Sequence, residues 1–182
     1  IESWMYPSAR YIEEHILPEH PDKPVICCEY SHAMGNSSGA MDKYIALTER
    51  QPRFQGAFIW DYIDQALLAK DRYGKEYYAY GGDFGDRPCD YNFCTDGIVY
   101  RDRTNSPKMQ TVKYNYQSIV VAVRDGEAEI RNKALFTDVS EFEGRVIVKK
   151  NGRIVEEQPF DASVAPLSSA VVPLPVRRRR EP

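Results

Sequence analysis

The chain has 182 residues, of which 42% are hydrophobic and 28% are charged, and its formal net charge is −3. This length allows one domain or two incomplete ones. The slightly negative charge excludes the basic surface of a nucleic-acid or anionic-membrane binder, and no apolar run is long enough to span a bilayer.

The start of the chain shows no targeting signal. Its first residues, Ile1-Glu2-Ser3-Trp4, have neither the basic start nor the apolar core of a signal peptide, and no initiating Met is present. We therefore expect the sequence to be an excised piece of a longer protein.

The first 118 residues alternate strand-like and helix-like segments. A strand is expected to end near Tyr6, followed by a helix that Pro18 stops. The apolar residues 25–28 predict a buried strand, and residues 39–50 a helix with one apolar face. A second buried strand is expected over 54–60. This βα repetition predicts a parallel sheet or barrel.

A long connection follows over residues 71–103. It is rich in Gly, Asp, Tyr and Pro and shows neither the helical nor the strand period. Connections of this length are usually functional or disordered, and the eight tyrosines and phenylalanines here argue against disorder. We expect an ordered active-site loop that leads into a helix over 107–117.

After Ser118 the pattern changes to short alternating runs joined by tight turns. Asp125-Gly126 and Asn151-Gly152 each separate two such runs and predict two β-hairpins. A further strand over 170–174 gives about five strands, which is typical of a β-sandwich that lacks some strands. The terminal Arg177–Arg180 run is interpreted as a solvated tail, with an acidic partner as the alternative.

The four cysteines predict reduced thiols. Cys27 and Cys28 are adjacent in an apparent strand, so their side chains should point to opposite faces. Reduced thiols favour a cytoplasmic location. A zinc site at Cys89 and Cys94 is the weaker alternative, since no second ligand pair lies at metal-binding spacing.

Glu29 is the candidate catalytic residue. It follows the apolar residues 24–28, where a buried parallel strand is expected to emerge. Barrel enzymes keep their chemistry at the C-terminal ends of such strands. On local sequence alone, a Glu in this place is more often a surface or salt-bridged group. The other acidic residues near loops are interpreted as structural: Asp61, Asp64, Asp83 and Asp86.

Several segments carry a resemblance, and they occur in one order along the chain. One of them contains the candidate residue: Cys28-Glu29-Tyr30-Ser31-His32-Ala33-Met34-Gly35-Asn36-Ser37. The others are Met5-Tyr6-Pro7-Ser8, Gly56-Ala57-Phe58-Ile59-Trp60-Asp61-Tyr62-Ile63-Asp64-Gln65, Tyr80-Gly81-Gly82-Asp83-Phe84-Gly85-Asp86, Phe93-Cys94-Thr95-Asp96-Gly97-Ile98-Val99 and Asn132-Lys133-Ala134-Leu135-Phe136-Thr137-Asp138. Together they resemble the β-galactosidases of glycoside hydrolase family 2, from residue 1 to about residue 176.

The resemblance implies a C-terminal portion of a TIM (β/α)8 barrel followed by an immunoglobulin-like β-sandwich domain. A complete barrel needs about 250 residues. Residues 1–118 would therefore supply strands six to eight of the barrel, and residues 119–182 a partial sandwich. The implied partners are a β-galactoside substrate, the remainder of the enzyme chain and further copies in a homo-oligomer.

The resemblance also assigns roles residue by residue. Glu29 matches the nucleophile that forms a galactosyl-enzyme intermediate, and Tyr6 the tyrosine whose hydroxyl hydrogen-bonds it. His32 matches a histidine of the galactose site, and Trp60 an apolar platform for sugar. Asp90 is a secondary substrate-binding candidate. Taken alone, Tyr6 and Trp60 would more often be core aromatics and His32 a loop residue.

The implied cofactors are Na⁺ and Mg²⁺. Phe93 matches the position whose backbone carbonyl binds sodium, and Asp96 occupies the place of a sodium-binding asparagine. This departure adds a negative charge and bears on ion preference. In the family, the acid/base glutamate and the magnesium ligands precede the nucleophile and would lie upstream of Ile1. The chain alone is therefore expected to be inactive.

These implications predict a retaining β-galactosidase, of which this chain is a fragment. The alternative from another class is a non-catalytic carbohydrate-binding or assembly fragment. Within the enzyme class, relatives of β-glucuronidase and β-mannosidase are further alternatives. The His32-Ala33-Met34-Gly35-Asn36 segment favours a galactosidase, because a glucuronidase would need cationic contacts to a sugar carboxylate.

Overall fold

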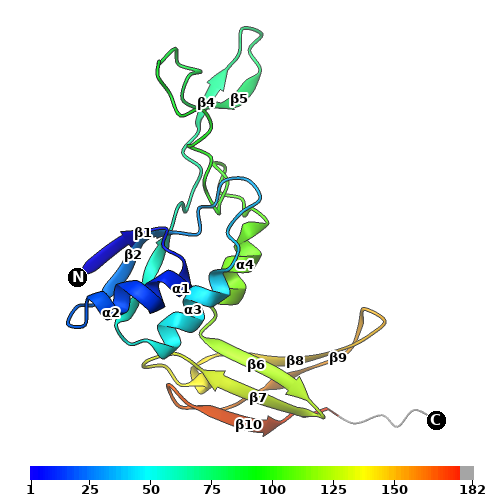
Figure 1. Ribbon diagram of the computed structural model, residues 1–182. Helices are drawn as coiled ribbons and strands as arrows, with labels where there is room; N and C mark the ends of the chain where they lie inside the picture. Colours follow the sequence, from blue (N-terminus) through cyan, green and yellow to red (C-terminus); the bar gives the residue numbers. More distant parts are fainter. Residues whose placement is uncertain (177–182) are drawn as a thin grey trace. The chain divides into compact units, whose positions relative to one another are not determined.

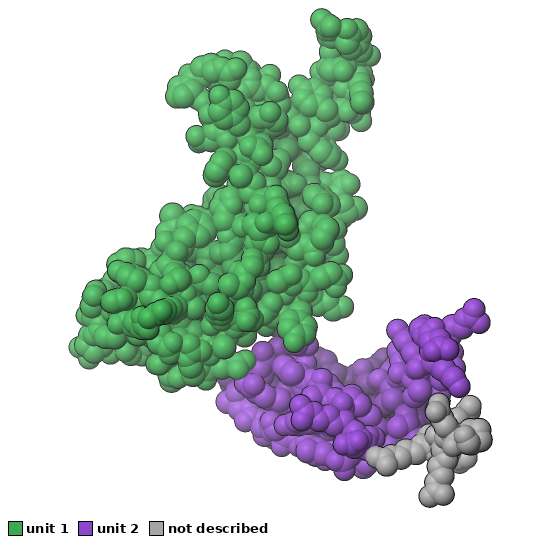
Figure 2. Space-filling view, turned by 45° about the vertical axis from the view of Figure 1, so that its right-hand side comes forward, with its two compact units in different colours: residues 1–116 green, residues 117–182 purple. Residues whose placement is uncertain are grey.

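A computed structural model describes residues 1–176, and it divides the chain into two compact units. The first comprises residues 1–116 and the second begins at Gln117 (Figure 1 and Figure 2). The assignment of these units to a barrel end over 1–118 and a partial sandwich over 119–182 stays a prediction. The Arg177–Arg180 run lies outside the described residues.

The centre of the first unit is a parallel sheet. It consists of β1 (Glu2–Met5), β2 (Val25–Tyr30) and β3 (Phe54–Ile59) in the order β1–β2–β3 (Figure 1). Both pairings are parallel, which confirms the parallel sheet predicted from the βα repetition. The carboxyl ends of all three strands therefore meet at one edge of the sheet.

One helical stretch follows β1 and runs past the proline expected to stop it. It comprises α1 (Ala9–Tyr11), the π-helical η1 (Ile12–Ile16) and α2 (Leu17–Glu19). The prediction that Pro18 ends the helix was wrong. Pro18 follows the π-helical segment after one intervening residue, and the stretch continues to Glu19 before it ends. A proline has no N–H to continue the helical bonding, so the helix ends close behind it rather than at it.

Two further helices, α3 (Met41–Arg50) and α4 (Lys108–Asn115), belong to this unit. The predicted apolar face of α3 is confirmed, since Met41 is buried and Tyr44 packs on the core. Core residues from helix and sheet include Ile12, Val25 and Phe54. None of the helices within residues 1–176 is long and apolar enough to cross a membrane.

The connection between β3 and α4 contains a hairpin that its composition did not predict. The strands β4 (Leu67–Lys70) and β5 (Glu76–Ala79) pair antiparallel. The Asp71 carboxylate closes the turn by accepting hydrogen bonds from the Tyr73 and Lys75 backbone N–H groups. With four residues in each strand, the hairpin is too short to show a clear period in the sequence.

The second unit is antiparallel. Its strands are β6 (Ile119–Arg124), β7 (Glu127–Asn132), β8 (Gly144–Lys150), β9 (Arg153–Phe160) and β10 (Ser169–Pro173), with a short 3₁₀-helix η2 (Val139–Glu141). They form a β10–β7–β6 sheet and a β8–β9 hairpin, which confirms the predicted hairpins and the fifth strand. Asp125, Gly126, Asn151 and Gly152 all have positive φ, as tight two-residue hairpin turns require.

The predicted orientation of the adjacent cysteines is confirmed. Cys27 is buried in the core of the first unit, whereas Cys28 is exposed. Burial raises the pKa of the Cys27 thiol to about 12. All four cysteines are free in the described part of the chain.

Candidate active site

The first two strands of the parallel sheet bring Glu29 and Tyr6 together. Glu29 is the fifth of the six residues of β2, and Tyr6 directly follows β1. The Tyr6 backbone N–H donates to the Glu29 carbonyl at 2.9 Å, and the Tyr6 hydroxyl donates to Glu29 Oε2 at 2.7 Å. Tyr6 has a φ of +55°, which lies in the left-handed region. Backbone and side chain together therefore fix the hydroxyl against the carboxylate.

The environment of Tyr6 keeps its hydroxyl protonated. Burial, followed by the hydrogen bond to Glu29 and the negative charge of that carboxylate, raises the pKa of Tyr6 far above its usual value. A protonated hydroxyl donates to the carboxylate that faces it. Tyr6 can therefore hold the Glu29 side chain in one orientation.

His32 lies between two aromatic rings beside this pair. Its ring centroid is 5.9 Å from that of Tyr6 and 5.7 Å from that of Phe93. Its Nε2 atom is 3.7 Å from Asp96 Oδ2. Its side chain is 30% exposed, so the imidazole remains open to solvent and to a ligand.

Trp60 follows β3 and joins the same cluster through Asp96. The indole Nε1–H donates to Asp96 Oδ2 at 3.3 Å. Trp60 is 38% exposed, so part of its ring is available as an apolar surface, whereas Asp96 is 3% exposed. The structure thus brings six of the sequence-predicted residues into one cluster: Tyr6, Glu29, His32, Trp60, Phe93 and Asp96.

Asp96 carries a buried oxygen without a protein partner. Its Oδ1 atom is buried and accepts no hydrogen bond. Burial raises the pKa of Asp96, while the nearby His32 and the Trp60 hydrogen bond oppose this rise. The charges of Asp61 and Asp64 raise it further. An ionised Asp96 is therefore costly unless a cation compensates it.

These groups fit a cation that takes oxygen ligands. The orphaned Oδ1 of Asp96 is a hard donor, the type that non-transition cations prefer. Within residues 1–176 no three His, Cys, Asp or Glu side chains form a metal-binding group. A cation here would therefore need backbone oxygens in addition, and the exposed Phe93 is the predicted source.

Asp90 lies in the same loop, but the structure connects it to the cluster through its backbone. Its carbonyl accepts a hydrogen bond from the Phe93 N–H at 3.2 Å. Its side chain is exposed. Asp90 therefore helps to shape the turn that presents Phe93, and its role in substrate binding stays a prediction.

Two residues with contacts to this cluster were not predicted as part of the site. Asp64, interpreted from the sequence as structural, accepts a hydrogen bond from the Gly97 N–H at 2.8 Å, next to Asp96. Lys108 of α4 donates to the carbonyl of Ala33, next to His32. Both bonds join segments more than 30 residues apart in sequence, and no local spacing could have indicated them.

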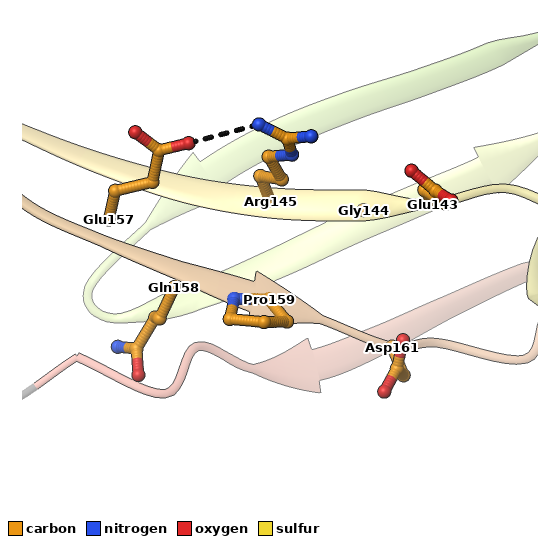
Figure 3. Close-up of a pocket in the computed structure, with 7 residues that line it drawn as sticks. All are labelled: Glu143, Gly144, Arg145, Glu157, Gln158, Pro159 and Asp161. Carbon is orange, nitrogen blue, oxygen red and sulfur yellow. Dashed lines mark hydrogen bonds and ion pairs between the residues drawn. The ribbon is translucent and has the colours of Figure 1, made fainter.

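The hollow in Figure 3 belongs to the second unit. It measures about 420 Å³ and is lined by residues of the β8–β9 hairpin and its flanks: Glu143, Gly144, Arg145, Glu157, Gln158, Pro159 and Asp161. Arg145 Nη1 lies 3.3 Å from Glu157 Oε1, and the two side chains are 64% and 42% exposed. None of the predicted site residues lines it.

Comparisons with known proteins cover almost the whole chain. A family model described as "Glycosyl hydrolases family 2, TIM barrel domain" matches residues 1–121, and one described as "Beta-galactosidase, domain 4" matches residues 128–182.

Curated relatives carry the same name. A β-galactosidase of Halalkalibacterium halodurans is 53% identical over 95% of this chain and 17% of its own length. A β-galactosidase of Clostridium acetobutylicum is 46% identical over 96% of this chain and 19% of its own length. A β-galactosidase of Streptococcus thermophilus is 41% identical, also over 96% of this chain and 19% of its own length. The chain thus spans less than a fifth of the length of these relatives.

Proposed function

The chain belongs to the glycosyl hydrolases family 2, and from this premise we propose that it carries the nucleophile of a retaining β-galactosidase. The observation that supports this most is the 2.7 Å hydrogen bond from the Tyr6 hydroxyl to Glu29 at the carboxyl ends of β1 and β2. In this proposal β1, β2 and β3 are strands six to eight of the barrel. The second unit is the start of an immunoglobulin-like sandwich domain.

The proposed reaction has two steps with inversion at each. In the first, an ionised Glu29 oxygen attacks the anomeric carbon of a terminal β-galactoside. The bond to the leaving-group oxygen breaks, and that oxygen takes a proton from a carboxylic acid. In the second step, the carboxyl group that protonated the leaving-group oxygen is ionised, and it removes a proton from water. The water oxygen attacks the anomeric carbon, and the bond between that carbon and Glu29 breaks.

Within this chain, Tyr6 would orient Glu29 before attack and stabilise its charge when it leaves. His32 and the exposed part of Trp60 would contact the galactosyl group. We propose that the acid/base glutamate and the Mg²⁺ ligands belong to the remainder of the enzyme chain, so residues 1–182 alone should be inactive. Homo-oligomer formation and a cytoplasmic location stay predictions.

Asp96 and the Phe93 carbonyl would hold the sodium ion. When bound, the ion supplies a positive charge beside the buried Asp96 carboxylate, whose Oδ1 has no protein partner. An ionised Asp96 is then compensated, and the orientation of the Trp60 indole N–H is retained through Oδ2.

The experiment that tests this function is substitution of Glu29 by Gln in the complete protein that contains this segment. The amide keeps the shape but is not a nucleophile, so turnover of an aryl β-galactoside should fall by about 10⁴-fold or more. The matched control is Glu157→Gln, since Glu157 lies in the second unit and forms an exposed ion pair with Arg145.

Control activity should stay within about twofold of the unsubstituted protein. Near-normal turnover in Glu29→Gln would remove Glu29 as nucleophile. Absence of galactosidase activity in the unsubstituted protein would favour the non-catalytic carbohydrate-binding alternative.

A further inference from the structure

The peptide group that joins Asp96 to Gly97 is held at both of its polar atoms. The Asp96 carbonyl accepts from the Asp61 N–H at 2.9 Å, and the Gly97 N–H donates to Asp64 Oδ1 at 2.8 Å. Both partners come from the segment that directly follows β3 and Trp60. Because one peptide plane is fixed at two ends, the backbone that carries the Asp96 side chain has little freedom to rotate.

Further backbone hydrogen bonds join the segment after β3 to the residues on both sides of the 96–97 peptide group. The Gln65 N–H donates to the Cys94 carbonyl at 2.7 Å, and the Asp64 N–H to the Val99 carbonyl at 3.0 Å. The approach is too close for any side chain at position 97, since a Cβ there would collide with the Asp64 nitrogen and the Val99 carbonyl. The hydrogen bond from Gly97 to Asp64 is therefore made where two backbones are already in contact.

The Asp64 carboxylate is the one side chain among these contacts. The other hydrogen bonds of this contact join backbone to backbone, so Asp64 is the place where a substitution can loosen the contact. The Asp96 side chain that this peptide group carries accepts from Trp60 Nε1 at Oδ2 and leaves Oδ1 without a protein partner. The Asp64 hydrogen bond therefore bears on where that free oxygen is presented.

We propose that Asp64 is a positioning residue: through the Gly97 N–H it fixes the Asp96 carboxylate in the geometry that binds the site cation and orients Trp60. This inference rests on the proposed function, since it needs the sodium site. It adds a residue that contacts neither sugar nor ion. Its loss should weaken cation binding by releasing the 96–97 peptide group.

The test measures sodium binding by thermal stabilisation of the complete protein. Melting temperature is recorded against NaCl concentration, with choline chloride keeping the ionic strength constant, because a ligand that binds the folded state raises the melting temperature. For Asp64→Ala the half-saturating sodium concentration should rise about tenfold, the scale of one lost hydrogen bond to a charged group. For Asp64→Asn, which keeps a neutral acceptor, the rise should be about threefold.

The matched control is Asp71→Ala. The Asp71 carboxylate likewise accepts hydrogen bonds from backbone N–H groups, but it does so within the β4–β5 turn. Its half-saturating sodium concentration should match that of the unsubstituted protein. If Asp64→Ala does not fold, Asp64→Asn carries the comparison.

The outcomes separate the two proposals. If the unsubstituted protein shows no sodium-specific stabilisation, the sodium site and this inference both fail. If it responds and the Asp64 variants respond at the same concentration, only the positioning role is overturned. Lower melting temperatures with an unchanged half-saturating concentration would likewise make Asp64 merely structural. An equal shift in Asp71→Ala would also overturn the inference.

Discussion

Asn132 in the second unit and Asp96 in the first are both buried polar residues, at 2% and 3% exposure, yet their surroundings differ. The Asn132 amide donates to the Thr137 and Val164 carbonyls, each at 2.9 Å, and its Oδ1 accepts from the Ala134 N–H at 3.0 Å. In the first unit, four buried side-chain atoms have no protein partner: Trp4 Nε1, Ser31 Oγ, Ser38 Oγ and Asp96 Oδ1. Of these, the Asp96 oxygen alone belongs to a group that can carry a negative charge, so it is the one that a bound cation would complete.

The same contrast extends to the two units as wholes. In the second unit, hairpin turns join β6 to β7 and β8 to β9, and the buried residues Ala128, Ile130 and Val164 form an apolar core. In the first unit, parallel strands end at one edge, and their last residues make contacts to distant loops. Function is therefore expected in the first unit and packing in the second.

The largest expected effect is a loss of stability in the core of the second unit, and it tests whether this unit serves packing alone. Ile130 is 1% exposed, and Ile130→Ala should lower the local stability of this unit by about 2–5 kcal/mol. Faster amide hydrogen exchange in β6 and β7 of the complete protein measures this loss. Val121→Ala, at a side chain that is 52% exposed on β6, is the control and should exchange nearly as the unsubstituted protein does.

Turnover of Ile130→Ala, measured where the protein is folded, should stay within about twofold if the second unit only packs. A drop in turnover without faster exchange would break the proposed division of roles.

The next effect concerns the pair at the edge of the parallel sheet. Tyr6→Phe keeps the ring beside His32 but removes the hydrogen bond to Glu29, which should lower kcat/KM about 10- to 100-fold. Because the pKa of Tyr6 is raised, its hydroxyl stays protonated at and above neutral pH. The ratio of kcat/KM for Tyr6→Phe to kcat/KM for the unsubstituted protein should therefore be constant between about pH 6 and 9.

Tyr114→Phe, at an α4 side chain that is 72% exposed, is the matched control and should leave the rate unchanged. A Tyr6→Phe protein as active as the control would mean that this hydrogen bond has no part in the chemistry.

A smaller effect tests the orphaned carboxylate directly. The pKa of Asp96 is raised in the folded protein, so its stabilising contribution is present below the unfolded pKa and is lost as pH rises through the folded one. Without sodium, Asp96→Asn should therefore melt higher than the unsubstituted protein at neutral pH, and the difference should shrink on acidification. An unchanged or lower melting temperature at neutral pH would contradict a costly buried charge.

The local fold was largely predictable because its signals are local. The short apolar runs predicted β2 and β3, and the Asp125-Gly126 and Asn151-Gly152 turns predicted two hairpins. The π-helical segment before Pro18 and the β4–β5 hairpin were missed, since helix geometry around a proline and a four-residue strand leave little trace in composition.

The site was only partly predictable. Glu29 could be proposed from its place after an apolar strand, but the roles of Tyr6, His32, Trp60 and Asp96 came from the family resemblance. The contact between Asp64 and Gly97 depends on two loops that meet 33 residues apart in sequence, and no periodicity encodes such a meeting. Residues that act through a backbone N–H are therefore the ones that sequence reasoning misses.

The central claim is that Glu29 is the residue that becomes covalently bound to the sugar. The most direct test incubates the complete protein with a 2-deoxy-2-fluoro-galactosyl donor, which slows breakdown of the intermediate, and maps the label by peptide mass spectrometry. The account predicts one label, on Glu29, together with loss of activity. A label on another carboxylate, or hydrolysis of β-galactosides with no label at all, would contradict it.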